Sequence, residues 1–258
     1  MSPEPAHGPP PLAMPSDQPP VTKMSEPARL AGVFFSPGKA FADIARRPRW
    51  WIPVILSAIL STVYLNAFTQ RVGWESVIRP AIEKSQNTQN MPVQQREQVI
   101  RTAAGLYKYL GYGSILLSLL SVFIIAVILM FLFDTMMSAG VGLNRMMAIV
   151  AYAFLPMMIY TALSMVVLFL KDPDEFNLQN PLMFNVGAFL STDAPAALRS
   201  LGSSIDLFSL WVVVLLAIGV SAAAHKISFG KALAGIALPW ALYVCIKVGA
   251  AAAGFSNG

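Results

Sequence analysis

Apolar stretches of about 20 residues recur five times along this 258-residue chain, and polar segments separate them. Each stretch approaches or exceeds the length that a helix needs to cross a hydrocarbon core about 30 Å thick. Only helices and closed barrels satisfy their backbone groups in lipid, and the alternating pattern of barrel strands is missing here. We therefore predict an all-α membrane protein, a five-helix transmembrane bundle. Its spans are expected at about residues 50–68, 113–133, 146–170, 205–224 and 232–254.

The polar segments predict the domain organisation. Residues 1–28 are rich in proline and poor in large apolar side chains, so we expect a disordered cytosolic tail. Residues 29–254 form the expected membrane domain, with short interfacial amphipathic helices at its N-terminal side, and residues 255–258 form a short tail. No apolar core follows a short basic start, so we expect the first span to direct membrane insertion. Apolar residues at helical spacing in 92–112 predict an amphipathic outer helix that runs toward the second span, either as a lid or simply on the membrane surface.

The composition narrows the chemistry. Hydrophobic residues make up 56% of the chain and charged residues 12%, about half the charged fraction of a soluble domain. The net charge is +5, and the cations flank apolar runs, which favours anionic lipid head groups over nucleic acid as partners. Cys245 is the one cysteine, which excludes an intrachain disulfide, and with His7 and His225 it is too little for a usual zinc site. Phosphate-loop and hydrolase motifs are missing, so we predict neither an enzyme nor a cofactor.

Lysine and arginine near the spans predict the orientation. They gather before the first span, between the second and third spans, and between the fourth and fifth. The cations concerned are Lys39, Arg46, Arg47, Arg49, Arg145, Lys226 and Lys231. These regions share one side of a five-span protein, which we assign to the cytoplasm. The N-terminus is therefore expected in the cytoplasm and the C-terminus outside.

The stretch "FFSPGKAFADIARRPRWW", residues 34–51, lies directly before the first span. Ser36 followed by Pro37 is typical of a helix start, and Phe41 and Ile44 then fall on one face. Such a short helix is expected in the head-group plane, with tryptophans at the interface. The segment is either a topological anchor or a docking platform for a cytosolic partner or a lipid. The predicted contact residues are Lys39, Phe41, Arg46, Arg47, Arg49, Trp50 and Trp51.

Two charges and two prolines lie within the later spans. Asp206 opens the fourth span on the outer side, and Lys247 lies toward the outer end of the fifth, so we predict that the two approach each other. The pair is either a structural ion pair, with a lysine that reaches the interface, or an ion-coupled site. Pro156 and Pro239 are expected to kink the third and fifth spans, either as static bends or beside a cavity.

The chain resembles the Yip-one domain family, membrane proteins named for their interaction with Ypt/Rab GTPases. The segments that carry the resemblance are "VFFSPGKAFADIARRPRWWIPVIL" (33–56), "AIVAYAFLPMMI" (148–159), "SSIDLFSLWVVVLLAIGVS" (203–221) and "SFGKALAGIALPW" (228–240). The resemblance covers about residues 29–254 and implies a five-span fold. Eukaryotic relatives act with small GTPases at secretory-pathway membranes, so a GTPase partner follows only from the resemblance. The long polar loop of residues 69–112 departs from those relatives and points to the bacterial branch, in an inner (plasma) membrane.

The predicted function is therefore non-catalytic. We expect a protein that acts in membrane organisation, trafficking-like processes or partner recruitment through its cytosolic N-terminal surface. The alternative is a small transporter or channel that uses the kinked third and fifth spans with Asp206 and Lys247. Small residues four apart, such as Gly219 and Ala223, allow close helix approach within the chain or between two copies of it.

Overall fold

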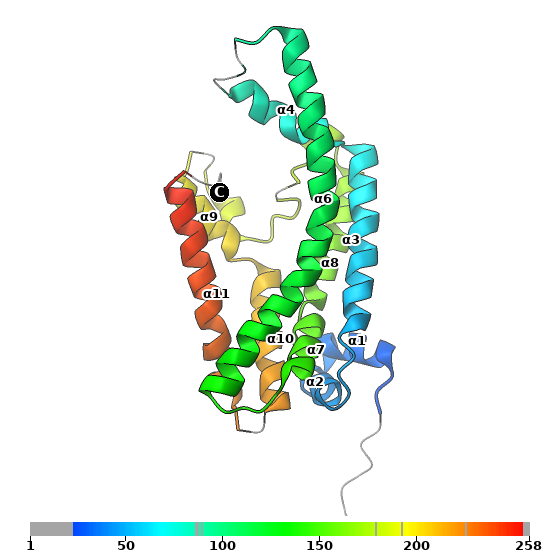
Figure 1. Ribbon diagram of the computed structural model, residues 1–258, viewed down its shortest axis with the longest axis vertical. Helices are drawn as coiled ribbons and strands as arrows, with labels where there is room; N and C mark the ends of the chain where they lie inside the picture. Colours follow the sequence, from blue (N-terminus) through cyan, green and yellow to red (C-terminus); the bar gives the residue numbers. More distant parts are fainter. Residues whose placement is uncertain are drawn as a thin grey trace, which may run out of the picture.

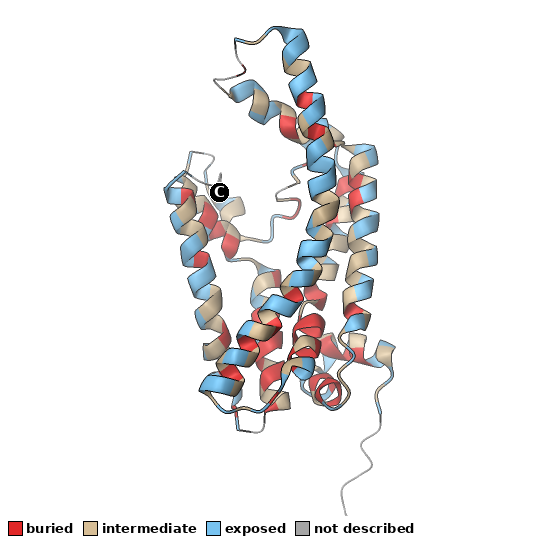
Figure 2. Cartoon of the chain, viewed as in Figure 1, coloured by how far each residue is buried: buried red, intermediate tan, exposed pale blue. Residues whose placement is uncertain are grey.

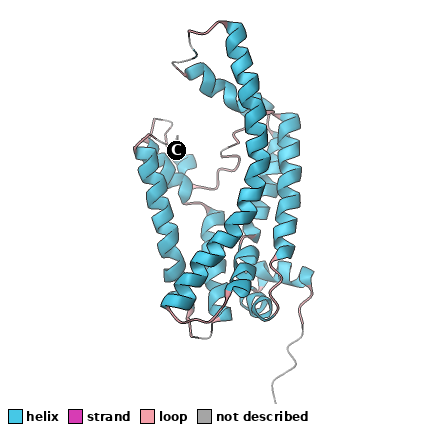
Figure 3. Ribbon diagram, viewed as in Figure 1, coloured by secondary structure: helices cyan, strands magenta, loops and turns pink. Residues whose placement is uncertain are grey.

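The computed structural model describes residues 23–254 except 86, 87, 89, 179, 192 and 225. Over these residues the fold is all-helical, and the one β-type pairing is an isolated bridge between Asn185 and Asp206 (Figure 3). Most of the predicted disordered tail and the short C-terminal tail lie outside the described residues. Helix α1 begins at Glu26, within the segment predicted to be disordered.

The helices follow the predicted apolar stretches and add short polar helices between them. Their bounds are α1 Glu26–Phe35, α2 Pro37–Arg46, α3 Trp51–Arg71, α4 Trp74–Lys84, α6 Val93–Met130, α7 Leu143–Ala153, α8 Leu155–Leu170, α9 Ala196–Ser204, α10 Leu207–Ala223 and α11 Phe229–Ala252. A π-helical segment, Phe131–Met136, extends α6, and 3-10 turns occupy Pro173–Glu175 and Val186–Phe189.

Four of the helices in the described part of the chain are long and apolar enough to cross a membrane. They are α3, α6 with its π-helical extension, α7 together with α8, and α11. The remaining predicted span is α10, which is apolar but has only 17 residues, or about 25 Å of helix. The structure therefore bears out the all-helical bundle with several membrane-length helices, and the helix at the predicted fourth span is shorter than the sequence predicted.

Helix α10 lies at the centre of the bundle. It packs against α2, α7, α8 and α11, and most of its large side chains are buried among them. Figure 2 shows that buried residues gather around α10 and α7, in the lower half of the molecule. A helix surrounded by protein meets little lipid, so its length is set by its neighbours and not by the thickness of the bilayer.

The chain passes back and forth between the two ends of the bundle. In Figure 1, α1 and α2 lie at the lower end, α3 rises, α6 descends, α7 and α8 rise, α10 descends and α11 rises. Helix α6 also extends above the bundle and forms an outer hairpin with α4 (Figure 1). The predicted outer helix at 92–112 and the predicted second span are therefore one continuous helix. Trp74 of α4 lies against Gly111 of α6, where a Cβ would be 2.6 Å from the indole ring.

The two prolines predicted to cause kinks behave differently. Helix α7 ends at Ala153 and α8 begins at Leu155, so the third span is interrupted directly before Pro156. Helix α11 continues through Pro239 to Ala252, so Pro239 does not end the helix. At the break between α7 and α8, the backbone of Phe154 departs from ideal α-helical values, with ψ near 0°.

Gly219 of α10 allows α2 and α7 to meet at the centre of the bundle. A Cβ built on Gly219 would lie 2.5 Å from Cγ2 of Ile149 and 3.0 Å from Cδ1 of Phe41. Ile149 and Phe41 are both fully buried. Glycine at this position therefore lets three helices approach more closely than any other residue would permit.

We expect Gly219→Ala to destabilise the fold by about 1–3 kcal/mol, because the added methyl group overpacks a tight core. The measurement is the thermal unfolding midpoint of the full-length protein in detergent. Gly249→Ala in α11 is the matched control, because a Cβ there meets no atom within 4 Å. Equal midpoints for the two variants would contradict the close packing at Gly219.

Candidate functional site

Helices α1 and α2 form a compact hairpin at the lower end of the bundle. The Ser25 side chain caps α1 by accepting a hydrogen bond from the amide of Ala28 at 3.3 Å. Ser36 separates the two helices, and its amide donates to the carbonyl of Gly32 at 2.8 Å. Pro37 then opens α2, as predicted, although the Ser36 side chain makes no capping hydrogen bond. The Ser-Pro pair therefore sets the turn through the backbone.

The apolar face of α2 packs against protein and does not face lipid. Phe41 and Ile44 have no exposed surface, and both belong to the main core with residues of α7 and α10. The predicted contact of this face with lipid is therefore wrong, and so is the assignment of Phe41 to a partner contact. The hydrophobic periodicity of α2 is compatible with either lipid or protein contact. In the structure Phe41 packs beside Gly219, so this face contacts protein.

A buried cluster of charged side chains holds the hairpin to the bundle. Arg29 is only 1% exposed, and its Nε donates to Oδ2 of Asp43 at 2.6 Å. Its Nη1 donates to Oε1 of Glu26 at 2.9 Å and to the carbonyl of Arg47 at 3.2 Å. The Arg47 guanidinium donates to the other carboxylate oxygen of Asp43. Each carboxylate therefore faces at least one guanidinium, which is what buried charges require.

The same cluster reaches the neighbouring elements. The Tyr152 hydroxyl of α7 donates to Oε2 of Glu26 at 2.8 Å. Arg49, directly before α3, donates from Nη1 to Oε1 of Glu26 at 3.1 Å. Glu26 thus connects the hairpin to the third span and to the start of the first. We call Glu26, Arg29, Asp43, Arg47 and Tyr152 the hairpin cluster.

The hairpin cluster keeps Asp43 ionised. Burial alone would raise the pKa of this carboxyl group, but hydrogen bonds from Arg47 and Arg29 and their positive charges outweigh that effect. The pKa of Asp43 therefore lies below its ordinary value of 3.8. For Arg29, burial opposes the charge, and the hydrogen bond and charge of Asp43 more than compensate, so its pKa is raised.

Two other predicted contact residues are also tied into the protein. Arg47 is about one third exposed and is bound to Asp43. Trp50 is partly buried and packs against the main core. Their first role is to attach the hairpin to the bundle, and they offer little free surface to a partner.

The remaining predicted residues, together with Phe35, form what we call the hairpin surface: Phe35, Lys39, Arg46, Arg49 and Trp51. Lys39 and Arg46 are exposed and make no ion pair within the described residues. Arg49 is exposed although it contacts Glu26, and Trp51 is half exposed. Phe35, which the sequence analysis did not single out, is 85% exposed at the end of α1. The hairpin surface thus combines cations with large apolar side chains on a rigid support.

The predicted pair of Asp206 and Lys247 is not formed. Asp206 caps α10, and its Oδ1 accepts hydrogen bonds from the amides of Phe208 and Ser209 at 3.0 and 2.9 Å. Lys247 donates from Nζ to the hydroxyls of Ser203 and Ser204 at 3.0 and 3.1 Å. The described part of the chain shows no ion pair between Asp206 and Lys247, because the free amides at the start of α10 already engage the carboxylate.

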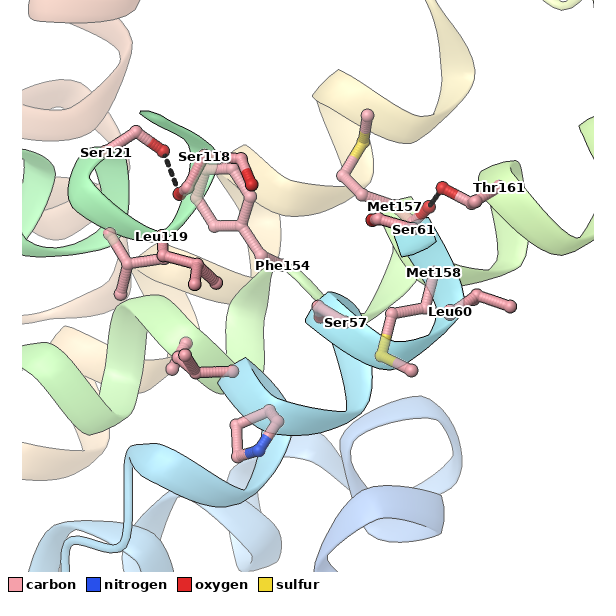
Figure 4. Close-up of a pocket in the computed structure, with 14 residues that line it drawn as sticks. Ser57, Leu60, Ser61, Ser118, Leu119, Ser121, Phe154, Met157, Met158 and Thr161 are labelled. Carbon is pink, nitrogen blue, oxygen red and sulfur yellow. Dashed lines mark hydrogen bonds between the residues drawn. The ribbon is translucent and has the colours of Figure 1, made fainter. Parts of the chain in front are cut away.

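A cavity of about 280 Å³ lies between α3, α6 and the break between α7 and α8. Its wall is mostly apolar and carries hydroxyl groups from three helices (Figure 4). Those residues are Ser57, Ser61, Ser118, Ser121 and Thr161. Ser121 and Thr161 donate to the carbonyls of Ser118 and Met157. Neither Asp206 nor Lys247 lines this cavity or the more open one beside Arg71.

Sequence reasoning missed the hairpin cluster as a site, although signals for it exist. Glu26 and Arg29 are three residues apart, and Asp43 and Arg47 are four apart, which places each pair on one helix face. Such pairs usually lie at the surface, so spacing alone indicates a solvated face. Only the approach of α1 to α2, and of Tyr152 to both, turns them into one buried cluster.

We expect Arg29→Met to destabilise the fold by about 3 kcal/mol, because it leaves the buried carboxylate of Asp43 with one of its two guanidinium partners. Arg79→Met is the matched control. Arg79 makes two hydrogen bonds to Glu97, at 2.6 and 3.0 Å, but both side chains are over a third exposed to solvent, so its loss should have a small effect. Thermal unfolding of both variants in detergent tests this. If Arg79→Met proves the more damaging change, the hairpin cluster does not hold the fold.

The lowered pKa of Asp43 predicts an acid-sensitive contribution to stability. This contribution is fully present above the unfolded value of 3.8 and is lost as the pH falls through the lower folded value. Asp43→Asn should therefore lower the unfolding midpoint at pH 7, and the gap from the wild type should narrow below about pH 4. Midpoints measured from pH 7 to pH 3 check this. A gap that stays constant over that range would contradict it.

The family comparison agrees with this architecture. The model of the Yip1 domain matches residues 31–250, from α1 to the last turns of α11. The chain is also similar to Membrane protein YknW of Bacillus subtilis (strain 168), with 26% identity over 196 residues, 76% of this chain and 78% of that protein. No solved structure matches the chain. The matched range includes the second half of α1, all of α2 and every apolar helix of the bundle, while Glu26 and Arg29 of the hairpin cluster lie before it. The chain therefore belongs to the Yip1 domain family of membrane proteins.

Proposed function

We propose that this protein recruits a cytosolic partner to the membrane through its hairpin surface. In this proposal it is non-catalytic, crosses the membrane five times, and has its N-terminus in the cytoplasm and its C-terminus outside. Its role is in membrane organisation or trafficking-like processes, in a bacterial inner membrane. The observation that carries the proposal is the buried hairpin cluster, which fixes an exposed, basic and aromatic surface at one end of the bundle.

Five crossings are supported by the path of the chain. The five apolar helical segments run alternately up and down, so α1 and the end of α11 lie at opposite ends (Figure 1). Helix α10 is shorter than the other apolar segments, but it is buried among α2, α7, α8 and α11. Its length therefore need not equal the thickness of the bilayer. A protein-lined helix of about 25 Å can cross if the local bilayer or its flanking loops adapt.

The orientation is supported by the charges at the hairpin end. Exposed cations from four separate segments lie there: Lys39, Arg46, Arg49, Arg145, Lys226 and Lys231. The carboxylates of Glu26, Asp43 and Asp134 at this end accept hydrogen bonds within the protein. The surface charge is therefore positive, which favours the cytoplasmic side.

Partner recruitment is supported by the rigidity of the hairpin. A binding surface built on packed helices loses little entropy when a partner docks, unlike a mobile tail. Exposed aromatic side chains and arginines are the residues that most often carry binding energy. Phe35 supplies an aromatic anchor, and Lys39 and Arg46 supply cations that are free to meet an acidic partner surface.

The alternative is a small transporter or channel. The hydroxyl-lined cavity beside the break before Pro156 is the observation in its favour. Asp206 and Lys247, which this alternative assigned to the transport path, line neither described cavity. A transporter would therefore have to use the hydroxyl groups of α3, α6 and α8, and Ser57→Ala with Thr161→Val would abolish its activity while leaving partner recovery unchanged.

The recruitment proposal predicts that Lys39→Gln with Arg46→Gln lowers recovery of the cytosolic partner by about tenfold or more, because electrostatic complementarity is lost. The measurement is co-purification or proximity labelling of the intact protein from native membrane. Neither residue is part of the hairpin cluster, so the fold should be retained. Arg49 is left unchanged because it contacts Glu26.

Lys84→Gln with Lys108→Gln is the matched control. It removes the same charge from exposed residues at the opposite end of the molecule. The control should recover the same partners as the wild type. The proposal fails if the hairpin variant keeps those partners in full, or if the control loses them equally.

A further inference from the structure

Helices α9 and α11 bring a lysine and a row of hydroxyl groups together at the end of the molecule opposite the hairpin. Lys247 of α11 donates to the hydroxyls of Ser203 and Ser204 of α9. Within the described residues Lys247 makes no ion pair, so its charge is met by neutral oxygens alone. A lysine in this state retains the capacity to bind an anion.

Two neighbouring polar groups of α9 also lack partners. Ser200 has no exposed surface, and its hydroxyl makes no hydrogen bond within the described structure. The Nε of Arg199 is likewise buried without an acceptor. Ser200 lies three and four positions before Ser203 and Ser204, and Arg199 lies four positions before Ser203, so the four residues occupy adjoining parts of one side of α9. Unsatisfied buried polar atoms in a native protein point to a missing partner.

The nearest carboxylate along the chain does not fill this need. Asp206 follows Ser204 by two residues, but its Oδ1 accepts the amides of Phe208 and Ser209. Arg199 and Lys247 thus remain two cations without an acidic partner in the described part of the chain. Cations with adjacent hydroxyls are the donors that bind phosphate groups in proteins.

The position of the cluster matches a lipid head group. Lys247 lies 18 residues after Phe229 in α11, or about 27 Å along the helix, close to the ~30 Å thickness of a hydrocarbon core. Apolar side chains of the same two helices are exposed around it, among them Leu198 of α9, Tyr243 at 61% and Ile246 at 64%. The cluster therefore borders an exposed apolar surface that suits contact with lipid, at the level of the head groups.

We propose that Arg199, Ser200, Ser203, Ser204 and Lys247 form a binding site for the phosphate of an anionic phospholipid in the leaflet opposite the hairpin. Lys247 provides the charge that the phosphate oxygens meet, and the unpartnered Nε of Arg199 and hydroxyl of Ser200 provide further donors. Ser203 and Ser204 hold the lysine in place, because their hydroxyls accept from Lys247 and donate to the carbonyl of Ser200. The site lies at the other end of the molecule from the hairpin surface, and its test does not depend on partner recruitment.

The experiment measures phospholipid binding to the full-length protein in detergent, by native mass spectrometry and by thermal stabilisation. The probes are phosphatidylglycerol, phosphatidylcholine and inorganic phosphate. We expect phosphatidylglycerol to bind at least several-fold more tightly than phosphatidylcholine. Lys247→Met with Arg199→Gln should weaken phosphatidylglycerol binding by about tenfold or more.

Two further variants separate loss of the site from loss of the fold. Lys231→Met removes an exposed cation from the other end of α11 and should bind as the wild type does. Lys247→Arg keeps the charge and should retain most of the binding. Lipid-free unfolding midpoints of all variants show whether each one is folded.

The outcomes also distinguish the source of the phosphate. Stabilisation of the wild type by inorganic phosphate alone, lost in the double variant, supports the site and assigns it to a free anion. Binding of phosphatidylglycerol without an effect of inorganic phosphate supports the lipid. The proposal is overturned if the folded double variant binds phosphatidylglycerol like the wild type, or if phosphatidylcholine binds equally well.

Discussion

The contact between α2 and α10 at Gly219 is the constraint on which the rest of the structure depends. It lets Phe41 and Ile149 meet over a backbone that carries no side chain, and so joins the N-terminal hairpin to the centre of the bundle. Once α2 is held there, α1 must fold back over it, and the charges of Arg29 and Asp43 are buried together. A larger residue at position 219 would separate the elements that make this possible.

The hairpin cluster follows from that packing and gives it a definite geometry. Buried ion pairs contribute little net stability, but they penalise arrangements in which one partner is left alone. Glu26 meets Arg29, Arg49 and Tyr152, so it fixes α1 relative to two membrane spans. The charged groups therefore select one position for the hairpin, and the exposed residues above them are presented on a rigid support.

The two ends of the molecule consequently offer different chemistry. At the hairpin end, the carboxylates are engaged internally and the exposed cations are free, which suits an acidic partner and the cytoplasmic side. At the opposite end, α4 and α6 project beyond the bundle, and Arg79 is surrounded by Glu75, Glu83 and Glu97. At that end Lys247 is bound only by serine hydroxyls, and the Nε of Arg199 is buried without an acceptor, which is why we assign a lipid phosphate to that position.

The sequence by itself determined the helical class, the approximate positions of the apolar segments and the family. The first two follow from the length and hydrophobicity of each segment, which are local properties that decide whether a helix can span a bilayer. It also located the break before Pro156. It did not determine what the amphipathic face of α2 packs against, because an apolar face with helical spacing is favourable against either lipid or a protein interior. Nor did it pair Lys247 correctly, because Ser203 and Ser204 lie within three residues of Asp206, and helical rise alone does not separate these three partners. Those choices were made by tertiary structure, which alone brings distant helices within hydrogen-bonding distance and decides which charges share a buried site.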